Sequence, residues 1–435
     1  MTTTLYRRGR VRSPADPFAT ALLVDGDTVA WVGQELAADA MSADVVVDLE
    51  DAWVAPAFVD AHVHATSTGL ALTGLDLTSS PSLAAALAAV EQAARRARGS
   101  VLLGTGWDET AWPERRPPTA SELDRASYGG VVYLARTDVH SAVASSALLA
   151  AAPEARRLPG FAGEGLVRQQ AHHAVRAAAY ASVTPAQRRS AQTAALRRAA
   201  ALGIGCVHEC GGPDIGGEED FTALLALEGD LPEVLGYWGE LDGVERAREL
   251  GAVGAGGDLF ADGALGSRTA HLCAPYADEP GSTGAAYLDA EQVGRHVAAC
   301  TRAGLQAGFH AIGDAALNAV LDGVDRAAAE VGAAPVRAAR HRVEHAELLT
   351  PELVARMAAH GSVASVQPAF DARWGGPDGM YVTRLGAERA RTMNPFAALA
   401  AAGVPLALSS DAPVTPLDPW GGVRAAVAHR NPGNG

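Results

Sequence analysis

The sequence has few cysteines, few cationic side chains and no long hydrophobic run. Four cysteines occur in 435 residues, with no C-x-x-C pair among them. So sparse a set excludes a disulfide-stapled secreted scaffold and favours a reducing cytoplasm. Lysine and arginine number 35 against 50 acidic residues, a net charge of −15. That balance argues against nucleic acid or an anionic membrane surface as a partner.

No stretch is apolar for the ~18 residues that a membrane span requires. The longest apolar stretch, around residues 396–408, is interrupted by a glycine and a proline. The basic segment from Met1 to Arg10 is not followed by an apolar run of signal length. We therefore expect a cytoplasmic protein without membrane partners that acts on a small-molecule substrate, and a homodimer is compatible with the sequence.

A short β-rich segment precedes a long alternation of strand-like and helix-like stretches. Asp25-Gly-Asp27 between two apolar runs predicts a hairpin. Beyond it, continuous apolar runs of strand length alternate with Ala/Arg/Glu-rich stretches whose apolar spacing is helical. The runs expected as strands are 58–64, 101–104, 131–135, 205–208, 234–237, 258–261, 306–310, 341–345, 362–366 and 405–409.

Strands that are apolar on both faces and lie between helices indicate a parallel sheet covered on both sides. This many units favours an α/β fold with a closed (β/α)8 barrel of the TIM type over an open sheet. We therefore predict an N-terminal β portion over residues 1–55 and a barrel over residues 56–435.

Imidazole and carboxylate side chains stand at the ends of several expected strands, where the active sites of such barrels lie. His62 and His64 form an H-x-H pair, and the alternation of side chains along a strand turns both into the barrel. Alone, such a pair is more often two core histidines, but it can also hold one metal ion. Three further expected strands end in His310, His345 and Asp411. Together the five side chains predict a metal site.

These segments resemble the amidohydrolase superfamily of metal-dependent hydrolases, in particular its branch of YtcJ-like hydrolases and N-substituted formamide deformylases. The resemblance runs from about residue 10 to the end. Besides the strand-end residues, it rests on segments 106–109 (GWDE), 136–140 (RTDVH), 260–270 (FADGALGSRTA), 310–314 (HAIGD), 340–346 (RHRVEHA) and 366–368 (VQP). It implies hydrolysis of a non-peptide carbon–nitrogen bond, of an amide or formamide, with one or two Zn²⁺ or other divalent ions as cofactor.

Two features depart from the family's pattern. Relatives carry a lysine just before the F-x-D-G segment, and its carboxylated form can bridge two metals, but here the residue is Asp258. An aspartate can also bind a metal but is shorter, so a one-metal site, a two-metal site and a solvated acid at a strand start all stay open. Relatives also continue well past the last barrel strand to complete a β-sandwich, whereas this sequence stops soon after that strand. We therefore expect only the N-terminal half of that sandwich, leaning on the barrel.

The resemblance also implies roles for the site residues. The reactive metal and its water would be held by His62, His64, His310 and Asp411. Asp411 would also act as general base and then general acid. His345 would bind a second metal or, in a one-metal site, polarise the substrate carbonyl. Asp60 is a candidate to hydrogen-bond the ring nitrogen of a ligand imidazole that does not bind the metal.

Residues outside the ligand set are candidates for substrate contacts. Each is equally open to a packing or ion-pair role: Trp107, Asp108, His140, Arg268 and Gln367. His341 shares a face with His345 but lies deeper in the barrel, so we expect a structural role for it.

Two other functions stay open. The same metal site could deaminate a heterocyclic amine, and a barrel that has lost its metal could persist as a binding protein. The aspartate at position 258 favours the metal-free alternative, whereas retention of the ligand histidines and of Asp411 argues against it.

Overall fold

The computed structural model describes residues 2–97, 99–109, 112–136 and 141–428. The chain divides into two compact units, Met1–Phe58 and Val59–Gly435. Within the described residues, no helix combines the length and the apolar character needed to cross a membrane.

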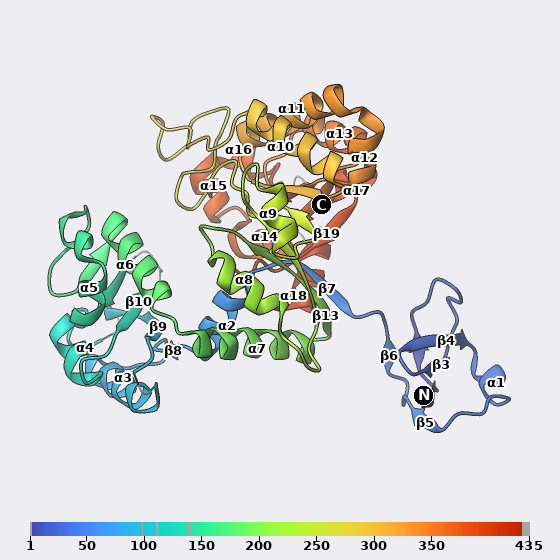
Figure 1. The fold of residues 1–435 in the computed structure, drawn as a ribbon, viewed down its shortest axis with the longest axis horizontal. Coiled ribbons are helices and arrows are strands. Elements are labelled where there is room, and N and C mark those ends of the chain that lie inside the picture. Colours follow the sequence, from blue (N-terminus) through green and yellow to red (C-terminus); the bar gives the residue numbers. More distant parts are fainter. Residues whose placement is uncertain (1, 98, 110–111, 137–140, 429–435) are drawn as a thin grey trace. The chain divides into compact units, whose positions relative to one another are not determined.

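The N-terminal unit is built on a four-stranded mixed sheet (Figure 1). Its strands, in sheet order, are β4 (Thr28–Gly33), β3 (Ala21–Asp25), β1 (Thr3–Arg7) and β5 (Val45–Asp48). β3 and β4 form the expected hairpin, in which Asp25 pairs with Thr28 and Gly26 has φ 62°. The short helix α1 (Glu35–Ala38) and a two-stranded pairing of β2 (Arg10–Val11) with β6 (Trp53–Val54) complete the unit.

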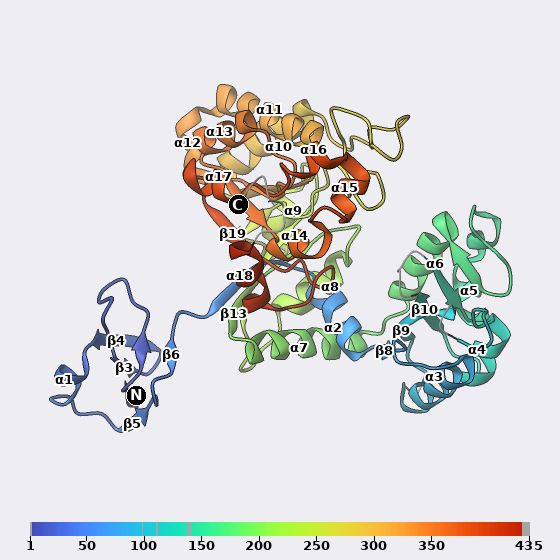
Figure 2. The ribbon, with the colours of Figure 1, turned by 180° about the vertical axis from the view of Figure 1, so that it is seen from behind.

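Eight strands of the second unit form a nearly closed parallel barrel (Figures 1 and 2). In order they are β7 (Phe58–Val63), β13 (Ile204–Gly211), β14 (Glu233–Trp238), β15 (Gly254–Ala255), β16 (Gln306–Ala311), β17 (Arg342–His345), β18 (Val363–Val366) and β19 (Leu406–Leu408). The first and last strands approach where the Asp411 amide donates to the His62 carbonyl at 2.9 Å. The α/β barrel expected from the sequence is thus confirmed.

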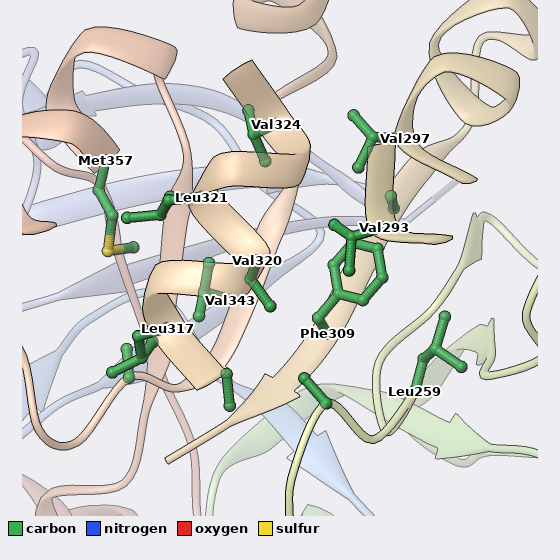
Figure 3. Close-up of a cluster of buried hydrophobic side chains, with 14 of the residues drawn as sticks. Leu259, Val293, Val297, Phe309, Leu317, Val320, Leu321, Val324, Val343 and Met357 are labelled. Carbon is green, nitrogen blue, oxygen red and sulfur yellow. The ribbon is translucent and has the colours of Figure 1, made fainter. Parts of the chain in front are cut away.

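Helices follow the barrel strands and cover them. They are α2 (Ala65–Thr73), α7 (Pro185–Ala201), α8 (Gly217–Leu225), α9 (Val244–Glu249), α10 (Ala290–Ala303), α11 (Asp314–Val331), α12 (Ala333–Ala339), α13 (Pro351–His360), α14 (Pro368–Trp374), α15 (Met380–Leu385), α16 (Ala387–Ala390), α17 (Phe396–Ala401) and α18 (Pro419–Val427). Figure 3 shows one part of the core, a single cluster of buried side chains that contains Val320 and Val324 of α11, Val293 and Val297 of α10, and Phe309 of β16. All five side chains are buried, so burial of apolar surface holds these helices on the strands.

Two of the runs expected among the barrel strands belong to a different sheet. The runs at 101–104 and 131–135 lie in β9 (Leu102–Trp107) and β10 (Val132–Arg136), inside an inserted lobe of residues 75–181. That lobe has a mixed sheet that also contains β8 (Leu75–Asp76), β11 (Ser141–Ala144) and β12 (Leu166–Arg168). Its helices are α3 (Leu83–Ala97), α4 (Ala120–Ala126), α5 (Ser146–Ala151) and α6 (Gln169–Ala181). An apolar run shows that a strand is buried, but not which sheet it joins.

The strand expected at 258–261 lies earlier in the chain. Strand β15 is Gly254–Ala255, and Asp258 lies beyond its carboxyl end. Two glycines end the strand, Gly256 with φ 152° and Gly257 with φ 88°. A Cβ at Gly256 would lie 2.1 Å from the Gly308 amide nitrogen, so the close approach of the neighbouring strand requires glycine there. Asp258 is therefore placed at the open end of the barrel rather than at a strand start.

His341 has the structural setting expected for it. It is 3 % exposed, its Nδ1 accepts the Ala307 N–H at 2.9 Å, and its Nε2 lies 2.9 Å from Thr301 Oγ1. Burial lowers the pKa of His341 to about 4. The pKa of this imidazole is lower in the folded protein than in the unfolded chain, where it is about 6.5, so the unfolded chain binds the proton more readily. The free energy of unfolding therefore falls as the pH falls from about 6.5 toward 4.

We expect His341→Asn to flatten this pH dependence, because asparagine keeps an acceptor for the Ala307 N–H but does not titrate. Between pH 7 and pH 5 the wild-type free energy of unfolding should fall by about 2 kcal/mol more than that of the variant. Urea unfolding of the metal-free proteins at the two pH values measures this. Equal losses in both proteins would show that His341 is not the titrating group.

Candidate metal centre

The six side chains predicted as metal ligands meet at one end of the barrel. Each comes from the carboxyl end of a barrel strand or the residues just beyond it. His62 is the next-to-last residue of β7, Asp258 follows β15, and His310 and His345 lie at the ends of β16 and β17. Two more follow β7 and β19, and these are His64 and Asp411. Five of the six are buried, and the His64 side chain is 13 % exposed.

Asp258 lies at the centre of this cluster. Its Oδ1 is 3.5 Å from His62 Nε2, 3.4 Å from His310 Nδ1 and 3.7 Å from His345 Nε2. Its Oδ2 is 3.1 Å from His64 Nε2. One short carboxylate thus reaches all four imidazoles.

Asp411 completes one side of the cluster. Its Oδ1 lies 3.2 Å from His64 Nε2 and 3.6 Å from His62 Nε2. The shortest of these distances divide the donors into two groups that share Asp258, although a ligand atom of His345 also lies within 4.8 Å of those of His62 and Asp411. The first half-site consists of His62, His64 and Asp411, and the second half-site consists of His310 and His345.

The chemistry of these donors fits a divalent cation. His62 Nε2 and Asp411 Oδ1 are buried and have no hydrogen-bond partner among the described residues. A buried polar atom without a partner is costly, and a metal ion removes that cost. Imidazole nitrogen and carboxylate oxygen suit zinc and other borderline divalent ions.

The electrostatic balance of the cluster also favours a cation. Burial lowers the pKa of the His64 imidazole, but the adjacent carboxylates of Asp258 and Asp411 raise this pKa well above its usual value. The two carboxylates thus favour positive charge at the centre of the cluster. In the metal-free protein that charge is carried by protons on the imidazoles. Metal binding there must release protons.

Two of the predicted ligands adopt backbone conformations that residues other than glycine rarely take. His345 has φ 67° and Asp411 has φ 53°. Left-handed residues of this kind cost of order 1 kcal/mol or more and persist where the surrounding structure over-determines them, often at functional sites. Both side chains are aimed into the cluster by this conformation.

Gln367, a candidate for substrate contact, hydrogen-bonds one of the predicted ligands. Its Oε1 is 2.8 Å from His345 Nδ1, and its Nε2 donates to Ser409 Oγ at 2.9 Å. The side chain is almost fully buried. If Nδ1 of His345 donates to this oxygen, its Nε2 is left to face Asp258.

The residue behind His62 is Glu344 rather than Asp60. Glu344 Oε2 lies 2.9 Å from His62 Nδ1. Asp60 uses its carboxylate on backbone amides, accepting from Ser410 N at 2.9 Å and from His62 N at 3.5 Å. Sequence reasoning did not select Glu344, although it stands directly before His345 in the shared segment 340–346.

Glu344 is held in turn by a buried arginine. Arg342 donates through Nε to Glu344 Oε1 at 2.7 Å and through Nη2 to the Ala61 carbonyl at 2.6 Å. Its guanidinium lies 4.3 Å from the centre of the Tyr237 ring, a cation–π distance. Burial alone would raise the pKa of Glu344, but Arg342 and His62 lower it well below its usual range, so Glu344 is ionised.

The remaining candidates for substrate contact have other partners. Trp107 is 1 % exposed in the apolar core of the lobe, and its Nε1 donates to the Leu134 carbonyl at 2.8 Å. Asp108 pairs with Arg136 at 3.0 Å. Arg268 pairs with Asp278 at 2.8 Å, so a substrate carboxylate would have to compete for its guanidinium. His140 lies outside the described residues.

We expect Trp107→Phe to weaken the lobe without changing substrate binding. The variant leaves the Leu134 carbonyl without its side-chain donor and should lower the free energy of unfolding by about 1–3 kcal/mol. Denaturant unfolding and steady-state kinetics measure the two effects. A KM raised about tenfold with unchanged stability would instead identify the ring as a substrate contact.

A cavity of about 330 Å³ opens beside Asp258. Its walls come from the residues that follow β13, β14 and β15 and from the segment before α10. They are Gly212, Asp214, Ile215, Gly239, Asp258, Leu259, Phe260, Tyr287 and Leu288. Phe260 also flanks a ligand, with its ring centre 4.8 Å from that of His310. The cluster therefore borders a space with largely apolar side-chain walls.

Comparison with known proteins agrees with this geometry. The model of the Amidohydrolase family matches residues 45–435. YtcJ of Bacillus subtilis, named as an amidohydrolase, is 29 % identical over 420 residues, covering 88 % of this chain and 75 % of YtcJ. The N-substituted formamide deformylase of Arthrobacter pascens is 31 % identical over 137 residues, 30 % of this chain and 25 % of that protein.

A solved structure shares the whole fold. The structure of an uncharacterized metal-dependent hydrolase from Pyrococcus furiosus superposes with a TM-score of 0.81 at 26 % identity, over 98 % of this chain and 89 % of that one. The family match extends over the entire barrel and its ligand cluster. The chain accordingly belongs to the amidohydrolase family, among its YtcJ-like members, and is a metal-dependent hydrolase.

Proposed function

We propose that this hydrolase cleaves a non-peptide carbon–nitrogen bond, that of an amide or formamide. The observation that carries the proposal is the convergence of four imidazoles and two carboxylates at the barrel end, with Asp258 within 3.7 Å of all four imidazoles. These side chains would hold a divalent ion, zinc by preference for such donors, and the chemistry that it would supply is activation of water and polarisation of the scissile carbonyl.

The protein's own residues would supply positioning and proton transfer. Asp411 would accept a proton from the attacking water and return it to the leaving nitrogen, as general base and then acid. His345, held by Gln367 at its Nδ1, would present its Nε2 to a second ion or to the substrate carbonyl. Asp258, in place of the lysine of relatives, would serve both half-sites.

The cavity beside Asp258 supports the choice of substrate. Ile215, Leu259, Phe260 and Leu288 give it apolar walls, which suit a hydrocarbon or aromatic substituent next to the scissile bond. Similarity over part of the chain to an N-substituted formamide deformylase points to the same class. Substituted formamides and simple N-acyl amines are therefore the first substrates to test.

The proposal is tested with zinc-loaded protein and a panel of N-alkyl formamides, N-benzyl formamides, N-acyl amines and heterocyclic amines. We expect release of formate or acid and free amine, loss of this activity on removal of zinc by a chelator, and recovery when zinc is returned. The chelated protein is the matched control. Ammonia release from a heterocyclic amine, without hydrolysis of any amide, would contradict the proposal and favour a deaminase.

A further inference from the structure

The two half-sites differ in the groups that hydrogen-bond the outer ring nitrogens of their imidazoles, that is, the nitrogens that point away from Asp258. His62 of the first half-site has the carboxylate of Glu344 at its Nδ1, 2.9 Å away. His345 of the second half-site has the neutral amide oxygen of Gln367 at the same atom, at 2.8 Å. The distances are nearly equal, so the difference lies in the charge of the acceptor.

The other imidazole of the second half-site also has a neutral partner. His310 Nε2 lies 3.2 Å from the Gly263 carbonyl oxygen, which leaves its Nδ1 toward Asp258. No charged side chain of the described residues hydrogen-bonds the outer nitrogen of either imidazole in this half-site. The closest carboxylate to these two imidazoles is therefore that of Asp258, whereas Asp262 Oδ1 lies 3.9 Å from His310 Nε2 and accepts the backbone amides of Ile312 and Gly313.

The first half-site has additional negative charge both in front of and behind its imidazoles. Asp411 Oδ1 lies 3.2 Å from His64 Nε2 and 3.6 Å from His62 Nε2, beside the shared Asp258. Glu344 adds a second carboxylate, fully buried and bonded to Arg342, which fixes its orientation. A carboxylate hydrogen-bonded to a ligand imidazole makes that imidazole a better donor, and loss of such a partner costs about 10- to 100-fold in metal affinity.

We propose that the two half-sites bind divalent ions with unequal affinity, and that Glu344 makes the half-site of His62, His64 and Asp411 the tight one. Gln367 leaves the half-site of His310 and His345 weak. Glu344 is thus a positioning residue that acts on the metal through His62. The inference rests on the metal dependence of the proposed function. It adds that the ion at the half-site of His310 and His345 is lost before the ion at the half-site of His62, His64 and Asp411.

Reciprocal substitutions test the inference, with zinc as the probe. The wild-type protein, Glu344→Gln and Gln367→Glu are loaded with zinc and titrated with chelators of graded affinity. The wild-type protein should release zinc in two separate steps. Glu344→Gln should weaken the tight step by about 10- to 100-fold, whereas Gln367→Glu should strengthen the weak step by about tenfold or more.

A matched control separates the effect of the hydrogen bond between Glu344 and His62 from the effect of removing a buried negative charge. Glu347 is a buried glutamate on the same segment whose Oε2 accepts the Tyr381 hydroxyl at 2.7 Å. Glu347→Gln removes a nearby charge without touching a ligand imidazole and should leave both zinc steps within about twofold of wild type. Circular dichroism monitors folding, because Glu344→Gln leaves Arg342 without its buried partner.

Each outcome decides between the alternatives. Release of both ions in one step from the wild type, or an unchanged tight step in folded Glu344→Gln, overturns the inference while zinc-dependent amide hydrolysis still stands. If Glu344→Gln does not fold, an unchanged weak step in Gln367→Glu overturns it equally. A wild type that binds a single zinc is the extreme of unequal affinity, and Glu344→Gln must weaken that ion. Failure of the wild type to bind zinc at all refutes the proposed function itself.

Discussion

Asp411→Asn should bind zinc with wild-type stoichiometry and lose turnover by a factor of about 10² to 10⁴, the usual contribution of a general acid–base residue. Asparagine matches aspartate in size and keeps an oxygen at the Oδ1 position, which faces His62 and His64. It cannot accept the proton of the attacking water. Asparagine also tolerates the left-handed conformation of position 411, where φ is 53°, so the backbone is not strained by the change.

The measurement is kcat together with zinc content by elemental analysis. Asp411→Ala is the useful comparison, because it also removes the oxygen donor and should lose zinc from the first half-site. If Asp411→Asn retained full activity, Asp411 would not be the general base and the proposed mechanism would fail. If it lost zinc together with activity, the residue would act as a ligand only.

Asp258→Ala should lower zinc affinity at both half-sites together. Asp258 is the one described carboxylate within 3.7 Å of all four imidazoles, so its removal leaves the second half-site with no described carboxylate that close; Asp262 lies 3.9 Å from His310 Nε2. We expect an affinity loss larger than the about 10- to 100-fold that follows loss of a partner behind a ligand. Activity should fall with zinc occupancy.

The comparison with Asp258→Asn sharpens this result, because asparagine preserves shape and one oxygen donor but not charge. Zinc per chain after dialysis against a weak chelator, and kcat/KM at saturating zinc, report the two effects. Two ions retained by Asp258→Ala would show that the shared carboxylate is not a ligand.

Much of the barrel and of the ligand set followed from the sequence, because both depend on local pattern. The period of two along β7 turns His62 and His64 to one side, and the strand-end positions of His310, His345 and Asp411 bring them to one end of a parallel barrel. Asp258 reached its place for a reason the apolar pattern did not reveal. Gly256 and Gly257 end β15 early and move the aspartate beyond the strand.

What the sequence could not predict depends on contacts between distant segments. Glu344 meets His62 across 282 positions of the chain, and Gln367 meets His345 across 22. Trp107 is a candidate for substrate contact from the sequence, yet its ring lies in an apolar core beside a separate sheet. Which residues stand behind the ligands, and which sheet a buried strand joins, are decided by tertiary packing rather than by periodicity.

The central claim is that the strand-end histidines and aspartates bind a divalent metal. The most direct test is zinc per chain, by elemental analysis, in purified protein that has been reconstituted with zinc and freed of excess metal. The account predicts one or two equivalents, reduced in Asp258→Ala. Fewer than about 0.2 equivalents in the folded wild-type protein would contradict it and would favour a metal-free binding protein on this barrel.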